Sequence, residues 1–249
     1  MRSTFWRRAV LWCLLIGIWE AISRVWPGVP AASTTARLVA ERLTDPTFLT
    51  ALAGSLRRMA IGYATVVVIG IGAGLTLGRF RAMDDLLGTL AVVINAMPGA
   101  AWVPFAIALF GLTEFAIIFT IVLGATGIVV INTSAGIKDV PPLLLQAGRT
   151  MGARGTKQFW HVIVPAAMPR IVDGLRLAWA FGWRALMAGE LLVASVRGMG
   201  QFISQMAKTR QMPELVALML IIAMVGVLVD GLVFRRLERS IRVRWGTAS

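Results

Sequence analysis

Long apolar stretches without a charged residue occupy much of the chain. Three of them cover 59–78, 86–113 and 115–137 and contain 20, 28 and 23 residues. About 18 apolar residues are enough for a helix to cross a bilayer core roughly 30 Å thick. Only helices and closed barrels satisfy their backbone polar groups in lipid, and these stretches lack the alternation of barrel strands. The pattern therefore predicts an all-α membrane protein.

The same pattern predicts six transmembrane helices within one domain that covers residues 1–249. A short surface helix is expected in addition over Thr35–Leu43, between the first two spans. Charged side chains interrupt the fifth span at Arg184 and Glu190 and approach the inner end of the sixth at Asp230. The predicted spans are 9–26, 56–78, 86–111, 115–137, 171–196 and 215–234.

The composition agrees with a bilayer environment. The chain is 57% hydrophobic and 15% charged, with a mean hydropathy of +0.77, whereas about a quarter of a typical soluble domain is charged. The net charge of +13 is interpreted as the Lys/Arg excess of cytoplasmic loops and not as a nucleic-acid surface. With both termini inside, cytoplasmic segments hold 15 of the 25 basic residues and outer segments hold eight. This count predicts cytoplasmic N- and C-termini.

Two smaller features of the sequence bear on the class of protein. An alternative for the N-terminal segment is a secretory signal peptide that ends in the small-residue site Val29–Ala31. The single cysteine, Cys13, excludes an internal disulfide, and the single histidine, His161, leaves little material for a metal site. We therefore expect no metal site and no catalytic constellation.

A segment of about 30 residues, Lys138–Met168, separates the fourth and fifth spans. Its apolar and polar positions recur at helical spacing, which predicts two short amphipathic helices on the cytoplasmic face. Gly152 and Gly155 interrupt the pattern, and Pro165 and Pro169 are expected to end it. On this pattern alone, the helices could equally lie on lipid headgroups or dock on a partner.

This segment contains a recognisable motif. Gln146-Ala147-Gly148, then Gly152, then Val162-Ile163-Val164-Pro165 resembles the EAA loop of ABC importer permeases. The spacings match, while Gln146, Gly148 and Val164 depart from the usual Glu, Ala and Leu. Further short stretches are similar to the taurine/sulfonate/nitrate branch of that family: Trp19-Glu20, 55–58, 98–104, Asn132-Thr133, 174–176, 188–190 and 237–239.

The resemblance implies a type I ABC importer permease with a cytoplasmic coupling-helix loop at 138–168. Such a chain pairs with a second copy in the bacterial inner membrane, binds two cytosolic ATPase subunits that hold ATP-Mg, and receives its substrate from a periplasmic binding protein. The chain itself would be no enzyme and bind no cofactor, and its cargo would be a small anion such as taurine, a sulfonate or nitrate. The ATPase-coupling residues would be Leu145, Gln146, Ala147, Gly148, Met151, Gly152, Phe159 and Pro165, with Leu145, Met151 and Phe159 as apolar anchors.

Six residues are candidates for the translocation pathway or its gate: Pro98, Gly99, Pro104, Asn132, Arg184 and Glu190. Prolines at membrane depth loosen a helix where it lines a cavity, although a simple kink is an alternative. Asn132 could instead make a hydrogen bond at a helix end. Arg184 and Glu190 are six residues apart, on roughly opposite faces, so Arg184 could pair with Glu114 or Asp230 instead of facing the pathway.

A small-residue face at Gly70, Gly74 and Gly78 indicates close helix packing, within the chain or between two copies. The rival function is a self-sufficient secondary transporter, which would use carboxylates such as Glu190 and Asp230, but no internal repeat is visible. Gly152–Lys157 lacks the spacing of a phosphate-binding loop. We therefore expect ATP to be bound by a partner chain.

Overall fold

The computed structural model describes residues 2–238, and over this range the chain forms helices and no strand. The predicted all-α fold is confirmed. Met1 and residues 239–249, including Arg239 of the last motif, lie outside the described residues. The helices are α1 Arg2–Val25, α2 Ala32–Arg42, α3 Pro46–Arg79, α4 Arg81–Ala96, α5 Trp102–Phe110, α6 Glu114–Lys138, α7 Pro142–Thr150, α8 Gly155–Gln158, α9 Val164–Leu192, α10 Met199–Lys208 and α11 Met212–Val229. Shorter turns are the 3₁₀ helix η1 Gly99–Ala101 and the π-helical turns η2 Phe159–Ile163 and η3 Asp230–Phe234.

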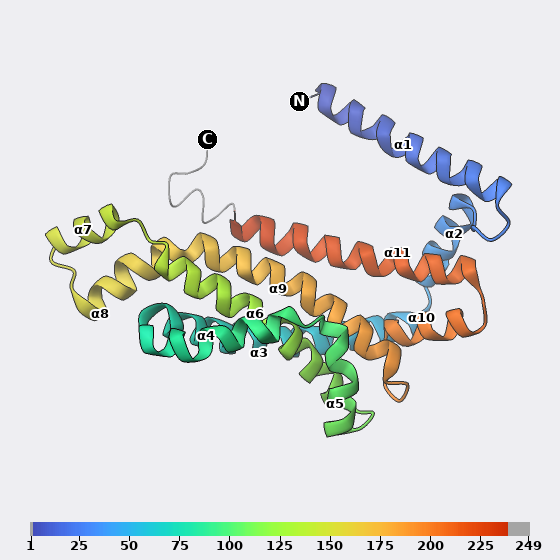
Figure 1. Cartoon of the computed structure of the whole chain (residues 1–249). Helices are drawn as coiled ribbons and strands as arrows, with labels where there is room; N and C mark the ends of the chain where they lie inside the picture. The colour runs from blue at the N-terminus through green and yellow to red at the C-terminus, as the bar shows by residue number, and fades with distance from the viewer. Residues whose placement is uncertain (1, 239–249) are drawn as a thin grey trace.

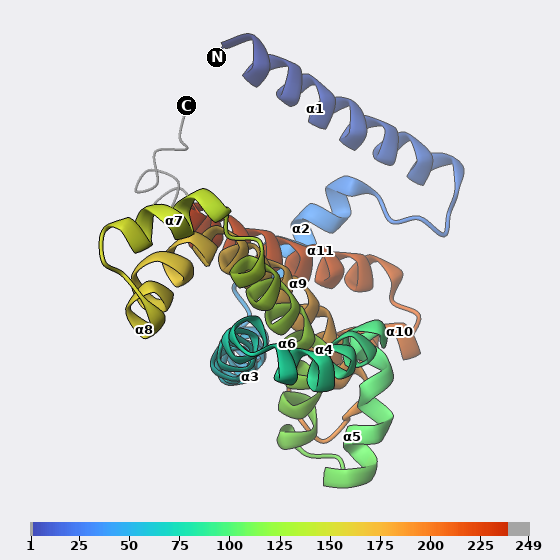
Figure 2. The same cartoon turned by 60° about the vertical axis from the view of Figure 1, so that its left-hand side comes forward.

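Three long helices form the centre of the molecule, with α6 packed against both α3 and α9 (Figures 1 and 2). Glycines on α3 recur every four residues and face α6 side chains that are also four residues apart. A Cβ at Gly70 would lie 2.6 Å from Val129, and one at Gly78 would lie 2.6 Å from Ile137. Since nothing larger than hydrogen fits there, the two helices approach closely. The small-residue face therefore packs within the chain, which decides between the two predicted roles.

The third predicted span is not one helix. α4 and the η1–α5 segment meet at an angle of 89°. The break falls at Met97, which has an extended backbone (φ −80°, ψ 131°), because the residue before a proline is disfavoured in the helical region. Pro104, in contrast, lies in the first turn of α5, where a missing N–H costs no helical hydrogen bond, and causes no second break.

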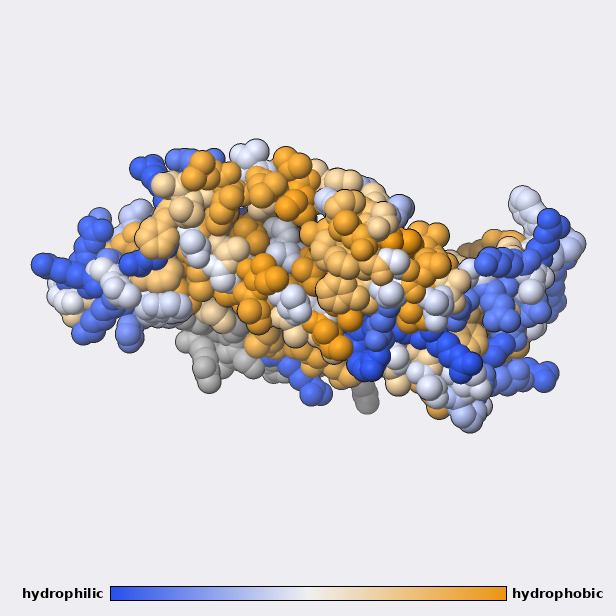
Figure 3. Space-filling model, turned by 90° about the horizontal axis from the view of Figure 1, so that it is seen from below, coloured by the Kyte–Doolittle hydropathy of each residue, from blue (hydrophilic) through white to orange (hydrophobic). Residues whose placement is uncertain are grey.

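By length and composition, three helical stretches of the described chain could each cross a membrane, and the bent pair could form a fourth span. The three are Pro46–Arg79, Glu114–Lys138 and Met212–Glu238. α1 and α9 cover the first and fifth predicted spans, but every 18-residue stretch of either helix contains three or more charged residues. Apolar residues cover the middle of the face seen in Figure 3, and hydrophilic residues gather towards both ends.

The segment after α6 differs from its prediction. The chain is helical without interruption from Gly155 through η2 and α9 to Leu192. Pro165 lies in the first turn of α9, directly after the π-helical turn, and Pro169 lies inside the helix, so neither ends it. A π-helical turn contains one extra residue, and this accommodates the change in backbone hydrogen bonding next to the proline. The short surface helix is present as α2, whereas α10 was not predicted.

The elements are distributed over two ends of the molecule (Figure 1). α7 and α8 lie at one end, near the C-terminal ends of α3 and α6, while α2 and α10 lie at the other. α1 extends beside the bundle and is held through α2; the indole N–H of Trp19 donates a hydrogen bond of 3.0 Å to the carbonyl of Pro30. The end that carries α7 and α8 is the one that the charge count predicts to be cytoplasmic.

Candidate functional site

α7 and α8 form a bent pair of helices that projects from one end of the bundle (Figure 1). Gly152 (φ +81°) and Gly155 (φ +56°) adopt left-handed conformations between the two helices, which residues with a Cβ rarely do. The side-chain amide of Gln158 donates a hydrogen bond of 2.9 Å to the carbonyl of Leu145. A Cβ at Gly148 would lie 3.0 Å from Val162, so α7 rests closely on η2. The motif's glycines and Gln158 thus fix the shape of this projection.

The projection carries an exposed surface that is both apolar and basic. Leu143, Met151 and Trp160 are 74%, 79% and 54% exposed. Between Asp139 and Asp173 the chain contains no acidic residue, and Arg149, Arg154 and Lys157 are exposed. We call Leu143, Leu144, Met151 and Trp160, with these three basic residues, the coupling surface.

The predicted coupling residues divide into an exposed and a buried set. Gln146, Ala147, Met151 and Gly152 are exposed, whereas Leu145 and Pro165 are half-buried and Gly148 is buried. Phe159 is only 4% exposed and packs with Ile137, Ala167 and Ile171. The Arg79 guanidinium lies 4.6 Å from the centre of its ring. Of the three predicted anchors, only Met151 is fully exposed, and Trp160 is exposed where Phe159 is not.

The break between α4 and α5 lies inside the bundle. A Cβ at Gly99 would lie 3.1 Å from the Cβ of Ala185 on α9, and Gly124 of α6 lies on the other side. Gly99 is therefore next to the C-terminal half of α9. Asn132 donates a hydrogen bond of 2.8 Å to the carbonyl of Ile128 and packs against Gly174. This bond lies inside α6 and not at its end, so the helix-end role and the pathway role of Asn132 both stay predictions.

Arg184 lies on an exposed face of α9, with its guanidinium 5.1 Å from the ring centre of Phe181. It forms no ion pair with Glu114 or Asp230, the two partners that the sequence suggested. Arg57 binds Glu114 at 2.5 and 2.8 Å. Arg176 binds Asp230 in a bidentate pair at 2.6 and 2.8 Å.

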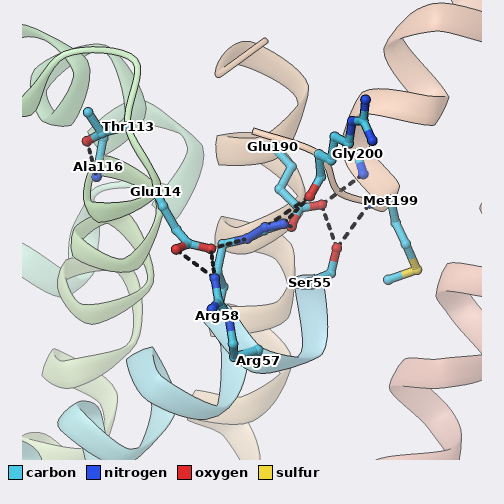
Figure 4. A network of polar contacts seen from close by, with 10 residues as sticks. Ser55, Arg57, Arg58, Thr113, Glu114, Ala116, Glu190, Met199 and Gly200 are labelled. Atoms are coloured by element: carbon cyan, nitrogen blue, oxygen red, sulfur yellow. Dashed lines mark hydrogen bonds and ion pairs between the residues drawn. The ribbon is translucent and has the colours of Figure 1, made fainter. Parts of the chain in front are cut away.

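Glu190, in contrast, is fully buried at the other end of α9, in a network shown in Figure 4. Its carboxylate accepts hydrogen bonds of 2.9 Å from the Ser55 hydroxyl and from the backbone N–H of Gly200. Arg58, which is 1% exposed, lies 3.3 Å from the same carboxylate. The Ser55 hydroxyl in turn accepts a hydrogen bond of 3.0 Å from the backbone N–H of Met199. The network ties α3, α9 and the start of α10 together.

Comparison with known proteins shows which family this chain belongs to. The family model described as "Binding-protein-dependent transport system inner membrane component" matches residues 66–243. This range covers the C-terminal part of α3 and every helix from α4 to α11, including the coupling surface. The chain belongs to this family.

Individual permeases are similar over much of their length. A "Putative ABC transporter permease protein" of Methanocaldococcus jannaschii is 35% identical over 71% of this chain and 66% of that protein. The "Nitrate import permease protein NrtB" of Synechocystis sp. is 32% identical over 71% of this chain and 64% of that protein. The chain thus spans a little under two thirds of the length of these two relatives. The "Putative aliphatic sulfonates transport permease protein SsuC" of Bacillus subtilis is 30% identical over 96% of this chain and 88% of that protein.

The fold of the family is found in a solved structure as well. A chain from inward-facing conformations of the MetNI methionine ABC transporter matches with a TM-score of 0.64, at 16% identity, over 78% of this chain and 96% of that chain. This likeness concerns the fold. The family confirms the predicted resemblance to ABC importer permeases, and none of these comparisons supports the rival prediction of a secondary transporter.

The permease leaves one region of its bundle open. None of the α4 residues is buried in the single chain, and Leu86 is 70% exposed. A hollow of about 670 Å³ lies between α4 and α6, lined among others by Asp84, Ser134 and Lys138. Lys138 and Asp84 form an ion pair of 2.6 Å at its rim. Sequence reasoning missed this hollow because its residues are far apart in the chain.

Sequence reasoning also missed the partners of Glu190. Ser55 and Arg58 belong to one of the short stretches that resemble sulfonate and nitrate permeases, and Glu190 belongs to another. Two motifs of that kind, one with two arginines and one with a glutamate, could have suggested a contact. Their distance of 135 residues along the chain hid it.

Proposed function

We propose that the chain is one of two identical permease subunits of an ATP-driven importer for a small anion. Two cytosolic ATPase subunits would bind ATP-Mg and drive the permeases, and a binding protein on the outer side would deliver the substrate. The observation that carries this proposal is the coupling surface, which projects at the end with the excess of basic residues. Both termini would be cytoplasmic, and the chain would lie in the cytoplasmic membrane.

The chemistry of the coupling surface suits a docking helix better than a headgroup-bound one. Met151 and Leu143 are exposed on a short helical projection whose shape is fixed by Gln158 and by the left-handed glycines. Apolar anchors on a preorganised helix bind a groove on a partner with little loss of conformational freedom. We expect acidic residues at the rim of that groove, because they would complement the charges of Arg149, Arg154 and Lys157.

Phe159, the buried residue beneath this surface, connects the projection to the membrane helices. Movement of the ATPase would reach those helices through it. Phe159 packs on Ile137 of α6 and Ile171 of α9, and it lies beneath the Arg79 guanidinium at the end of α3. All three central helices thus meet at one aromatic ring. A displacement of the projection would therefore move α3, α6 and α9 together.

A second copy would cover the open region beside α4. Leu86, Leu90 and Val93 are 70%, 52% and 56% exposed along that helix, next to a polar hollow that includes the Lys138–Asp84 pair. A face with apolar and polar parts suits a subunit interface that encloses an aqueous pathway, and lipid alone would leave the polar part unsatisfied. The cargo is proposed from the relatives named for nitrate and for aliphatic sulfonates, both of which are small anions.

The proposal is tested by copurification of the chain with its ATPase from membranes in which both are expressed. Replacing Leu143→Glu together with Met151→Glu places carboxylates on the coupling surface, and we expect the ATPase to be lost. A matched control, Leu43→Glu with Met212→Glu, makes the same change at exposed apolar positions near the opposite end. It should retain the ATPase. Equal ATPase recovery from both variants would contradict the proposal.

A further inference from the structure

Arg184 is a charged residue of α9 that forms no ion pair within the described chain. The side chain is exposed, eight residues before the end of α9 at Leu192, which places it about 12 Å below that end. An arginine facing lipid at such depth costs about 2.5–3.5 kcal/mol on the scale of membrane insertion, so intramembrane charges face partners or water.

No carboxylate in the described part of the chain neutralises Arg184. The nearby acidic residues are already bound: Glu114 by Arg57, Glu190 by Arg58 and Asp230 by Arg176. Asp173 shares the exposed face of α9 but lies eleven residues away, or about 16 Å along the axis. The positive charge is therefore uncompensated where the single chain presents it.

A second observation marks the same level of the bundle. The residue that follows, Ala185, is in contact with Gly99 at the 89° break between α4 and α5. Interrupted membrane helices are tolerated where they are buried in protein or line a cavity, and in transporters they mark the level of the substrate site. An uncompensated arginine beside such a break points to an aqueous site for a negative charge.

We infer that Arg184 faces water in the translocation pathway and binds the anionic group of the substrate. This inference rests on the proposed function and names the residue that would select the charge of the cargo. The face around it is otherwise apolar, with Leu177 and Phe181 two turns and one turn towards the cytoplasm and Ala188 one turn outward. Each copy would contribute one guanidinium among apolar side chains, which would bind an anionic group such as nitrate or a sulfonate reversibly.

Cysteine reactivity in the assembled complex tests the inference without knowledge of the natural substrate. The only native thiol is removed by Cys13→Ser, and Ala188→Cys places a new one on the Arg184 face. Its reaction rates are measured with two methanethiosulfonate reagents, one bearing a sulfonate and one a trimethylammonium group. We expect reaction with both, and Arg184→Gln should lower the ratio of anionic to cationic rates about tenfold, while Arg184→Lys preserves it. Nitrate, bicarbonate or methanesulfonate should slow the anionic reaction only while residue 184 is positive.

Three results would overturn the inference: no reaction of the thiol at position 188 with either reagent, an unchanged ratio in Arg184→Gln, or no slowing by any of the three anions. Val227→Cys, on the exposed apolar side of α11, is the control and should stay unreactive. Retention of the ATPase by each variant reports that the complex is intact. A chain that never binds an ATPase would refute the proposed function, and the rate ratio measured at position 188 would still decide the role of Arg184.

Discussion

The two ends of α9 are stabilised by opposite kinds of chemistry. Near Leu192, Glu190 is fully buried and bound to Arg58, Ser55 and the backbone of α10. Near Val164, the helix continues into a projection on which the apolar side chains of Met151 and Trp160 are exposed. The first end pairs its buried charges within the chain, and the second exposes apolar surface. We therefore expect the end near Leu192 to keep its geometry without a partner, and the coupling surface to be covered when the proposed partner binds.

The largest expected effect is at the outer end. Glu190→Ala leaves the buried Arg58 guanidinium with only the more distant Glu114 carboxylate, at 3.7 Å, as counter-ion and removes the cap at the start of α10, and we expect a loss of about 3–5 kcal/mol. Thermal unfolding of the purified chain in detergent measures it. Replacing both partners, Arg58→Met with Glu190→Met, should be less harmful than the two single changes added together, because no charge then remains buried. Additive losses would show that the pair is not coupled.

A somewhat smaller effect is expected at Phe159, beneath the coupling surface. Phe159→Ala removes a buried ring from contacts with α6 and α9 and should cost about 3 kcal/mol or more. Trp160→Ala, one residue along, removes a side chain that is 54% exposed and should cost much less. The same unfolding assay compares them. A larger loss for Trp160 would reverse the assignment of buried and exposed faces.

A smaller effect on stability, confined to the projection of α7 and α8, is expected at Gln158. Gln158→Ala removes the hydrogen bond to the carbonyl of Leu145, a change of about 1 kcal/mol. We expect faster amide hydrogen exchange in α7 and no change in α10. The neighbouring exposed residue Lys157, changed to Ala, is the control. Equal exchange in both variants would mean that this bond does not hold the two helices together.

The smallest effect on stability is expected for Leu143→Glu with Met151→Glu. Both side chains are exposed, so the unfolding free energy should change by no more than about 0.5 kcal/mol. Binding of the ATPase should nevertheless be lost. A large destabilisation would show instead that these residues pack within the chain.

The sequence predicted the central helices well where their apolar pattern is long. The fourth predicted span, 115–137, corresponds to α6 at Glu114–Lys138. A kink or gate element was expected near Pro98 within one span, whereas the structure has a break of 89°, and Gly99 contacts Ala185, which a local pattern does not contain. α10 was missed because its start is capped by Glu190 and by Ser55, which is 144 residues from Met199.

The predicted coupling residues show the same limit of prediction from sequence at Phe159. Phe159 and Trp160 are both large and apolar, so composition does not tell which faces inward. Helical periodicity fails there because the π-helical turn of 159–163 inserts a residue and rotates the face that follows. The motif spacing around Gln146 and Pro165 located the projection, and only the packing identified its exposed members.

Site-specific photocrosslinking tests the central claim, that the coupling surface binds the ATPase, most directly. A photoreactive amino acid is placed at Met151, at Trp160 or at Phe159, and the complex is irradiated in its membrane. We predict crosslinks to the ATPase from positions 151 and 160, and crosslinks only within the permease from position 159. ATPase crosslinks from position 159, or their absence from position 151, would contradict the account.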